Sequence, residues 1–154
     1  MKATAKSETR PRHKPTLEEM AFLDLAHTTE LLSGPVVQLL KTADLSPPQY
    51  NILRILRGSP DGLTCREVGN RMITRDPDIT RLLDRLEKRG LISRNRDEKD
   101  RRVVFARITE DGLDLLASLD QPVRELHRKL LGHLGPEGLQ TLAELMDACR
   151  RGLA

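Results

Sequence analysis

The sequence predicts a mostly α-helical fold with one small β-hairpin. Leucine and other apolar residues recur at the spacing of amphipathic helices along most of the 154 residues. Residues suited to cap a helix precede these stretches, and Gly or Pro follows them. Only two short segments, 91–95 and 103–108, look like strands, and they flank a run of six charged residues. The length favours one domain, or a small domain with appended helices.

The first 45 residues divide into an arm and a long helix. Residues 1–15 are basic, contain two prolines and lack apolar periodicity, so we expect a flexible basic arm. Thr16 is a suitable N-cap, and the leucines that follow it predict a helix over 16–45. The Gly34-Pro35 pair is expected to kink or break this helix.

Capping signals mark three helices in the middle of the chain. Residues 46–49, Ser-Pro-Pro-Gln, open the first helix as a capping box with Pro at its first position. Residues 64–67, Thr-Cys-Arg-Glu, form a second capping box that opens a short helix. Asp76 is expected to cap the third helix, with Pro77 as its first residue and Gly90 after its end.

The last two of these helices form a predicted helix-turn-helix, because the second begins shortly after the first ends. Segments 91–95 and 103–108 then form a hairpin directly behind it. A helix-turn-helix followed by a hairpin is a winged helix-turn-helix, here over residues 46–109. The charged run DEKDRR, residues 97–102, forms the tip of the predicted wing.

The C-terminal part is expected to hold two more helices. Thr109 caps the first, Pro122 is expected to bend it, and Gly135-Pro136 opens the second. These helices and the one over 16–45 contain more leucine than a monomer of this size needs. We therefore expect 16–45 and 110–154 to be the N- and C-terminal dimerisation helices of a homodimer.

Positive charge is concentrated in the middle of the chain. The formal net charge is +3, but residues 1–15 carry +4, 16–45 carry −4, 46–109 carry +6 and 110–154 carry −3. A basic segment between acidic flanks is a candidate footprint for a polyanion such as double-stranded DNA. By charge alone, an ordinary solvated surface explains the pattern equally well.

Nothing in the sequence indicates an enzyme or a membrane protein. The chain contains no phosphate-binding loop or nucleophile motif, and its four histidines lack metal-ligand spacing. We therefore expect no catalysis, no cofactor and no metal. No apolar run approaches about 18 residues, so we expect a cytoplasmic protein that does not contact a membrane.

The two cysteines are too few and too far apart to indicate a disulfide framework. Cys65 is expected in the first turn of a helix beside Arg66, an arrangement that can activate a thiol. The alternative, which we prefer, is that Cys65 is a small packing residue. Cys149 is expected to pack on the apolar face of the last helix.

Residues 80–112, TRLLDRLEKRGLISRNRDEKDRRVVFARITEDG, resemble the MarR family of bacterial transcriptional regulators. The segments TRLLDRLEKRGLI, D-x-x-D-x-R and ARITEDG carry the resemblance, and LSPPQYNILRIL at 45–56 is also similar. The resemblance implies a homodimeric regulator, such as a repressor, that binds palindromic DNA and is released by a small-molecule effector or an oxidant. The family's redox branch keeps its sensing thiol in the first helix, where this chain has no Cys, so peroxide sensing is not expected.

The outward face of the third central helix and the wing supply the candidate DNA contacts. Periodicity turns Thr80, Arg81, Arg85 and Lys88 outward, and arginine is suited to bidentate contact with guanine. The predicted DNA-binding residues are Arg75, Thr80, Arg81, Arg85, Lys88, Lys99, Arg101 and Arg102. The alternative is a solvated face with an i,i+4 pair between Asp84 and Lys88.

The acidic residues near these positions need separate explanations. Arg101 and Arg102 are expected to enter the minor groove, whereas Asp97 and Asp100 are expected to hydrogen-bond the turn and hold an arginine in position. The alternative is a hairpin tip kept soluble by mixed charge. Asp76 and Asp78, which bracket Pro77 at the start of the helix, either both point away from DNA, or one of them accepts a hydrogen bond from a cytosine amine.

Two other classes of function stay open, a protein-binding winged helix and an architectural DNA binder without sequence preference. The basicity confined to 46–109 favours DNA as the partner. Salt-dependent retention on random duplex separates DNA binding from protein binding, and competition with unrelated DNA tests for sequence preference. The effector site is unassigned: His27 and Tyr50 are candidates, but a role in the core is preferred for each.

Overall fold

The computed structural model describes residues 14–74, 77–97 and 100–153. The predicted arm therefore lies almost entirely outside the described residues. In chain order the elements are α1 (Leu17–Lys41), α2 (Pro47–Arg57), β1 (Leu63–Thr64), α3 (Cys65–Arg71), α4 (Ile79–Lys88), β2 (Ile92–Arg96), β3 (Val104–Ile108), α5 (Glu110–Leu131), the 3-10 helix η1 (Gly132–Leu134) and α6 (Gly135–Gly152). This order confirms the predicted mostly α-helical winged helix-turn-helix with a small hairpin.

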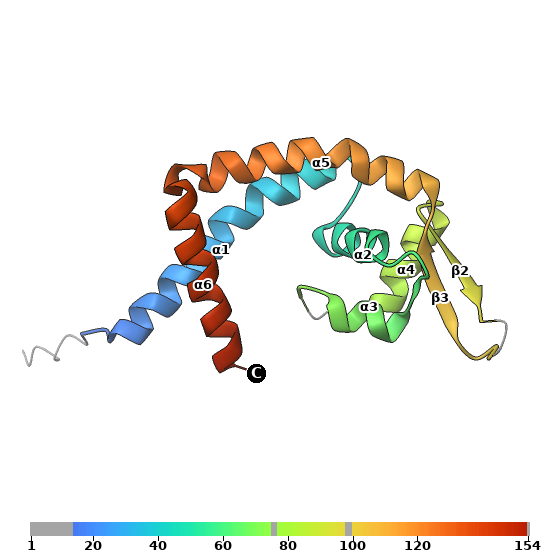
Figure 1. The fold of residues 1–154 in the computed structure, drawn as a ribbon, viewed down its shortest axis with the longest axis horizontal. Coiled ribbons are helices and arrows are strands. Elements are labelled where there is room, and N and C mark those ends of the chain that lie inside the picture. Colours follow the sequence, from blue (N-terminus) through green and yellow to red (C-terminus); the bar gives the residue numbers. More distant parts are fainter. Residues whose placement is uncertain (1–13, 75–76, 98–99, 154) are drawn as a thin grey trace, which may run out of the picture.

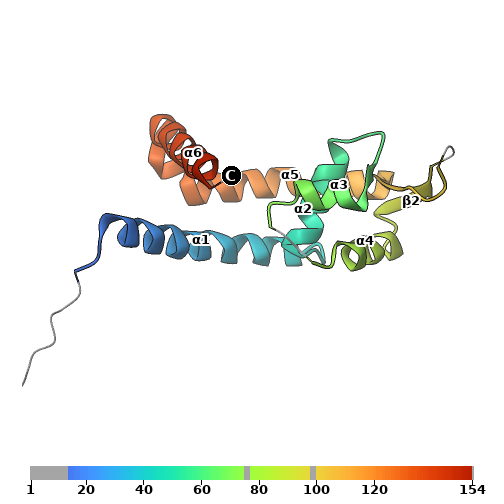
Figure 2. The ribbon, with the colours of Figure 1, turned by 90° about the horizontal axis from the view of Figure 1, so that it is seen from below.

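The helices are distributed over two ends of an elongated molecule. α5 runs along most of its length, with α2, α3, α4 and the strands gathered at one end (Figure 1). α1 and α6 occupy the other end, where they cross in Figure 1 but lie well apart in Figure 2. α6 therefore turns away from α5 through η1 without covering α1.

Local capping fixes where the helices begin. Capping boxes open α1, α2 and α3, and they pair Thr16 with Glu19, Ser46 with Gln49, and Thr64 with Glu67. The backbone N–H of Thr64 donates to the Glu67 carboxylate at 2.8 Å. This hydrogen bond favours the ionised carboxylate and holds the pKa of Glu67 below its usual value. The predicted starts of these three helices are confirmed.

Of the two outcomes predicted at Gly34-Pro35, a kink or a break, the break does not occur, because α1 continues through the pair. Pro35 has no N–H, so one main-chain hydrogen bond of the helix is lost. Both residues are exposed, and water can therefore satisfy the carbonyl oxygen that loses its donor. α5 likewise continues through Pro122.

The start of α4 differs from the prediction. Asp78 is the N-cap, and its carboxylate accepts a hydrogen bond from the Arg81 N–H at 3.4 Å. Pro77 lies in the turn before the helix and is not its first residue, so α4 begins at Ile79. Gly90, with φ of 72°, follows the helix as predicted.

The sheet contains one strand more than the predicted hairpin. β2 and β3 pair antiparallel from Ile92 opposite Ile108 to Arg96 opposite Val104. β1 adds to the other edge of β3, with Leu63 opposite Ala106, which gives the order β1-β3-β2. This short strand ties the start of α3 to the base of the wing.

The core lies within the winged helix and the helix ends that adjoin it. Its most buried side chains are Leu40, Ile52, Leu53, Leu56, Val68, Leu83, Leu86, Ile92 and Leu116. α1 contributes only its last turns, and α6 buries no residue. Large apolar side chains are instead exposed along α1 and α6. No helix in the described ranges is long and apolar enough to cross a membrane.

Gly112 is a position where the packing leaves no space for a side chain. A Cβ there would overlap the Leu91 carbonyl oxygen and lie 2.7 Å from Cγ1 of Ile108. The Leu91 oxygen cannot move freely, because it accepts a hydrogen bond from the Thr109 N–H at 3.1 Å. We expect Gly112→Ala to lower the free energy of unfolding by about 1–3 kcal/mol, measured by urea denaturation followed by circular dichroism.

Gly34→Ala is the matched control for this substitution. Gly34 also lies within a helix, but a Cβ there would have no heavy atom within 4 Å. Alanine at this position is expected to be neutral or to stabilise by up to about 1 kcal/mol. Equal stability of Gly112→Ala and the wild type would show that the contact with Leu91 relaxes easily.

Candidate nucleic-acid interface

α4 separates apolar and polar side chains onto opposite faces. Its buried residues are Ile79, Leu82, Leu83 and Leu86. Thr80, Arg81, Arg85 and Lys88 are exposed on the other side, as the periodicity predicts. The helix therefore presents three cations and a hydroxyl to solvent.

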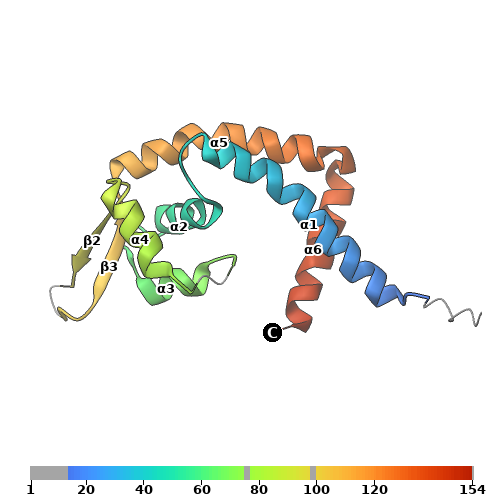
Figure 3. The same ribbon diagram turned by 180° about the vertical axis from the view of Figure 1, so that it is seen from behind.

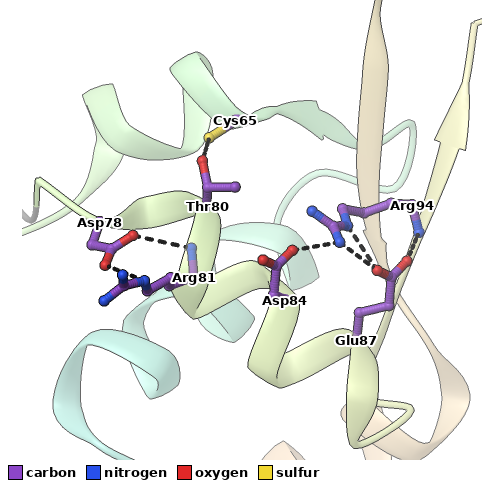
Figure 4. A network of polar contacts seen from close by, with 7 residues as sticks. All are labelled: Cys65, Asp78, Thr80, Arg81, Asp84, Glu87 and Arg94. Carbon is purple, nitrogen blue, oxygen red and sulfur yellow. Dashed lines mark hydrogen bonds and ion pairs between the residues drawn. The ribbon is translucent and has the colours of Figure 1, made fainter.

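Asp78 is engaged at the N-terminal end of α4. Besides capping the helix, its carboxylate lies 3.2 Å from Nε of Arg81, as Figure 4 shows. The Arg81 side chain stays 75% exposed in this ion pair. Asp78 therefore orients the base of Arg81 while the guanidinium remains accessible to a partner.

Cys65 lies beside the first turn of α4. Its sulfur is 3.7 Å from Oγ1 of Thr80 (Figure 4), and the residue is exposed. The prediction that Cys65 is a packing residue is therefore wrong. Cys149 is also exposed in the single chain, on the last turns of α6. Within the described residues, no three His, Cys, Asp or Glu side chains form a group that could hold a metal ion.

Arg94 on β2 connects the hairpin to α4, and the sequence interpretation missed it. One of its terminal nitrogens, Nη2, lies 2.6 Å from both Asp84 and Glu87 (Figure 4). Its Nε and its backbone N–H also donate to the Glu87 carboxylate, at 2.9 and 3.1 Å. The side-chain hydrogen bonds to Glu87, and to a lesser extent the one to Asp84, raise the pKa of Arg94 above its usual value. Asp84 thus pairs with Arg94, rather than with Lys88 as the alternative interpretation proposed.

Acidic side chains order the described part of the wing tip. The Asp97 carboxylate accepts the Asp100 N–H at 2.9 Å, and the Asp100 carboxylate accepts the Arg102 N–H at 3.0 Å. The backbone closes the turn with two bonds, Asp97 N–H to Val103 O and Val103 N–H to Asp100 O. Nε of Arg102 is 3.9 Å from Asp100, and its side chain is 96% exposed. This geometry supports a positioning role for both acids, which stays a prediction.

The structure brings the two candidate surfaces to one end of the molecule. Figure 3 shows α4 beside β2 and β3, and the two strands extend past the helix. Thr80, Arg81, Arg85 and Lys88 thus lie on the helix, and Arg101 and Arg102 on the neighbouring wing. Arg75 and Lys99, also predicted to contact DNA, lie outside the described residues.

Arg89 is a second supporting residue that the sequence did not reveal. It follows α4, and its guanidinium donates to the carbonyl oxygens of Asp44 and Ala43 at 2.5 and 3.1 Å. This contact anchors the C-terminal end of α4 to the turn between α1 and α2. No local pattern links residues 45 positions apart, so the sequence contains no signal for it.

The chain is similar to known regulators over nearly its whole length. A sequence model of the MarR family matches residues 45–104. A MarR transcription factor from Planctomyces limnophilus is 38% identical, with a TM-score of 0.68 over 88% of this chain and 99% of that chain. Sco3205 from Streptomyces coelicolor, a MarR family regulator solved in complex with DNA, is 27% identical, with a TM-score of 0.79 over 94% and 92%. The PcaV transcriptional regulator from the same species, solved with its natural ligand, is 26% identical, with a TM-score of 0.71 over 84% and 93%.

Proposed function

This chain belongs to the MarR family of DNA-binding transcriptional regulators. We propose that it is a sequence-specific repressor that binds palindromic DNA as a homodimer. We further propose that it responds to a small-molecule effector. The observation that carries the proposal is the placement of the cationic face of α4 beside the wing at one end of the molecule. Binding across a promoter would then exclude other proteins from it. The proposal also places the protein in the cytoplasm, where bacterial DNA is accessible.

α4 is proposed to lie in the major groove. Arg81 and Arg85 are one helical turn apart on its exposed face, a spacing that lets both reach base edges, with guanine the preferred partner of arginine. Thr80 and Lys88, together with Arg75 before the helix, are assigned to phosphates or neighbouring bases. Lys99, Arg101 and Arg102 of the wing are assigned to the backbone and the minor groove of the same half-site.

The terminal helices are proposed to form the dimer. The exposed apolar side chains on and around them are Leu17, Met20, Phe22, Leu23, Leu25, Leu31, Leu134, Leu139, Leu145 and Leu153. A second copy would remove this surface from water in a closed two-fold arrangement. We therefore assign dimerisation to 16–45 and 110–154, DNA binding to 46–109, and no fixed role beyond its charge to the arm over 1–15.

The proposed dimerisation helices and the proposed DNA-binding part share one continuous core. Leu40 of α1 and Leu116, Leu119 and Val123 of α5 pack in the same cluster as the winged helix. A change in how the terminal helices pack would therefore reach the DNA-binding helices, which suits an effector that acts between them. One hollow near this junction is lined by Val37, Lys41, Asp44, Leu45, Ser46 and Pro47. It includes neither His27 nor Tyr50, and the effector site stays unassigned.

Selection of bound fragments from random DNA tests the proposal directly. We expect a palindromic sequence to be enriched, with half-sites spaced by about one helical turn. Binding to that operator should weaken steeply with salt, because phosphate contacts release counterions. Competition by unrelated DNA at equal strength would favour an architectural binder, and salt-independent retention or none would favour a protein-binding module.

A substitution in the wing is expected to act against its formal charge. Asp100→Ala removes a negative charge near DNA, yet we expect it to weaken binding, because Asp100 accepts the Arg102 N–H and lies close to its guanidinium. Arg102→Ala is the companion variant. It should weaken operator and random DNA together and lower the slope of log K against log salt by about 1. Tighter binding by Asp100→Ala in a salt titration would contradict the positioning role.

A further inference from the structure

α4, the helix proposed to lie in the major groove, carries two carboxylates among the cations that face DNA in the proposed function. Asp84 lies between Arg81 and Lys88 along the helix, and Glu87 lies one turn from it. Their side chains are 42% and 36% exposed, so neither charge is hidden from the surface. Carboxylates at such a position repel phosphates, and like charges across an interface slow association and lower affinity.

Arg94 pairs with both carboxylates and offsets part of their negative charge from the hairpin side of α4. Its side chain is 26% exposed, less than either partner, and a single nitrogen bridges Asp84 and Glu87. Glu87 accepts three hydrogen bonds from Arg94 alone, two from the side chain and the third from the backbone. Because β2 supplies this arginine, the cation approaches from the hairpin side and not from the side of the exposed cations.

We infer that Arg94 is a positioning residue of the DNA interface, which holds Asp84 and Glu87 so that they neither oppose phosphates nor capture the DNA-facing cations of α4. This inference rests on the proposed placement of α4 in the groove. Asp84 lies four residues before Lys88 and three residues after Arg81 on the same helix. Without Arg94, Asp84 could form an ion pair with either cation, and that pair would compete with DNA for it. The hairpin thus serves the recognition helix as well as carrying the wing.

Charge rescue tests this role. Arg94→Met keeps much of the apolar stem but removes the cation, and we expect it to weaken binding of labelled operator and random duplex by about tenfold. Adding Asp84→Asn and Glu87→Gln should recover most of that loss. A purely structural role predicts no recovery, because the triple variant has lost still more native charge pairs. A triple variant as weak as Arg94→Met overturns the inference.

A second variant decides the question should Arg94→Met fold poorly. Asp84→Asn/Glu87→Gln, with Arg94 kept, is expected to bind random duplex at least as tightly as the wild type, since it removes negative charge and releases a cation. Weaker binding by this variant overturns the inference. Thermal unfolding of every variant, followed by circular dichroism, separates lost affinity from lost folding.

Two controls separate this inference from the proposed function. Arg57→Met removes another arginine–carboxylate ion pair, in which Nη1 of Arg57 lies 3.0 and 2.8 Å from the two carboxylate oxygens of Asp120, and which includes no residue of α4 or the wing. If Arg57→Met loses as much DNA affinity as Arg94→Met, the positioning role of Arg94 is overturned. Arg85→Ala is measured in parallel. If Arg85→Ala loses DNA affinity as expected but the triple variant stays as weak as Arg94→Met, only the role of Arg94 is overturned. If Arg85→Ala loses no DNA affinity, the placement of α4 on DNA is overturned, and this inference with it.

Discussion

Deletion of residues 136–154 is expected to abolish the homodimer and, with it, tight binding to the operator. α6 buries no residue in the single chain, whereas Leu145 and Leu153 are 57% and 87% exposed. If this face closes the dimer, the truncated chain exposes its leucine-rich partner surface and becomes monomer or aggregate. A monomer holds one half-site, so operator affinity should fall by roughly 10²–10⁴, the gain that linked half-sites provide.

The winged helix itself should survive this deletion. Its core draws on α1, α2, α3, α4, α5 and the sheet but on no residue of α6. Sedimentation equilibrium and DNA titration of the truncated chain therefore report assembly rather than unfolding. Leu145→Glu is a milder version of the same test, and Gln140→Glu, on an exposed polar position of α6, is its matched control. A truncated protein that stays a soluble dimer with intact operator binding would contradict the proposed interface.

The elements that the sequence predicted are those defined by neighbouring residues. Ser46 and Gln49 form their capping box three residues apart, so the start of α2 was visible in the sequence. Asp76 and Asp78 are both plausible caps, and the choice between them depends on burying Ile79 in the core. β1 contains only two residues, and its pairing with β3 joins positions over 40 residues apart. Tertiary contacts of this kind leave no periodic signal.

In the candidate site, too, the features set by neighbouring residues were predicted and those set by tertiary contacts were not. The outward direction of Arg81, Arg85 and Lys88 follows from helical periodicity, and the structure confirms it. Arg94 was missed because its partners Asp84 and Glu87 lie across a turn and on another element. The exposure of Cys65 depends on how α3 meets α4, which residue spacing does not define. Sequence thus identified the surface, and the structure identified what supports it.

Replacing both Arg81 and Arg85 by Ala is expected to remove most of the operator preference. One bidentate arginine–guanine contact contributes about 1–3 kcal/mol of discrimination, so two independent contacts contribute about 2–6 kcal/mol. Random-sequence duplex should lose far less affinity, because phosphate contacts by the wing and by Lys88 remain. Fluorescence anisotropy titrations with operator and random duplex at matched salt measure both losses.

Lys88→Ala provides the comparison on the same helix face. A phosphate contact carries no sequence information, so this variant should weaken operator and random DNA by the same factor and lower the salt slope by about 1. Arg85→Ala alone should instead relax preference at one position in each half-site.

Arg81 forms an ion pair with Asp78 at 3.2 Å in the free protein. Asp78→Asn should therefore alter the binding that depends on Arg81 and leave the base preference at the Arg85 position unchanged. Equal losses on operator and random DNA for the double arginine variant would show that α4 contacts phosphates only, and base recognition would then have to come from the wing.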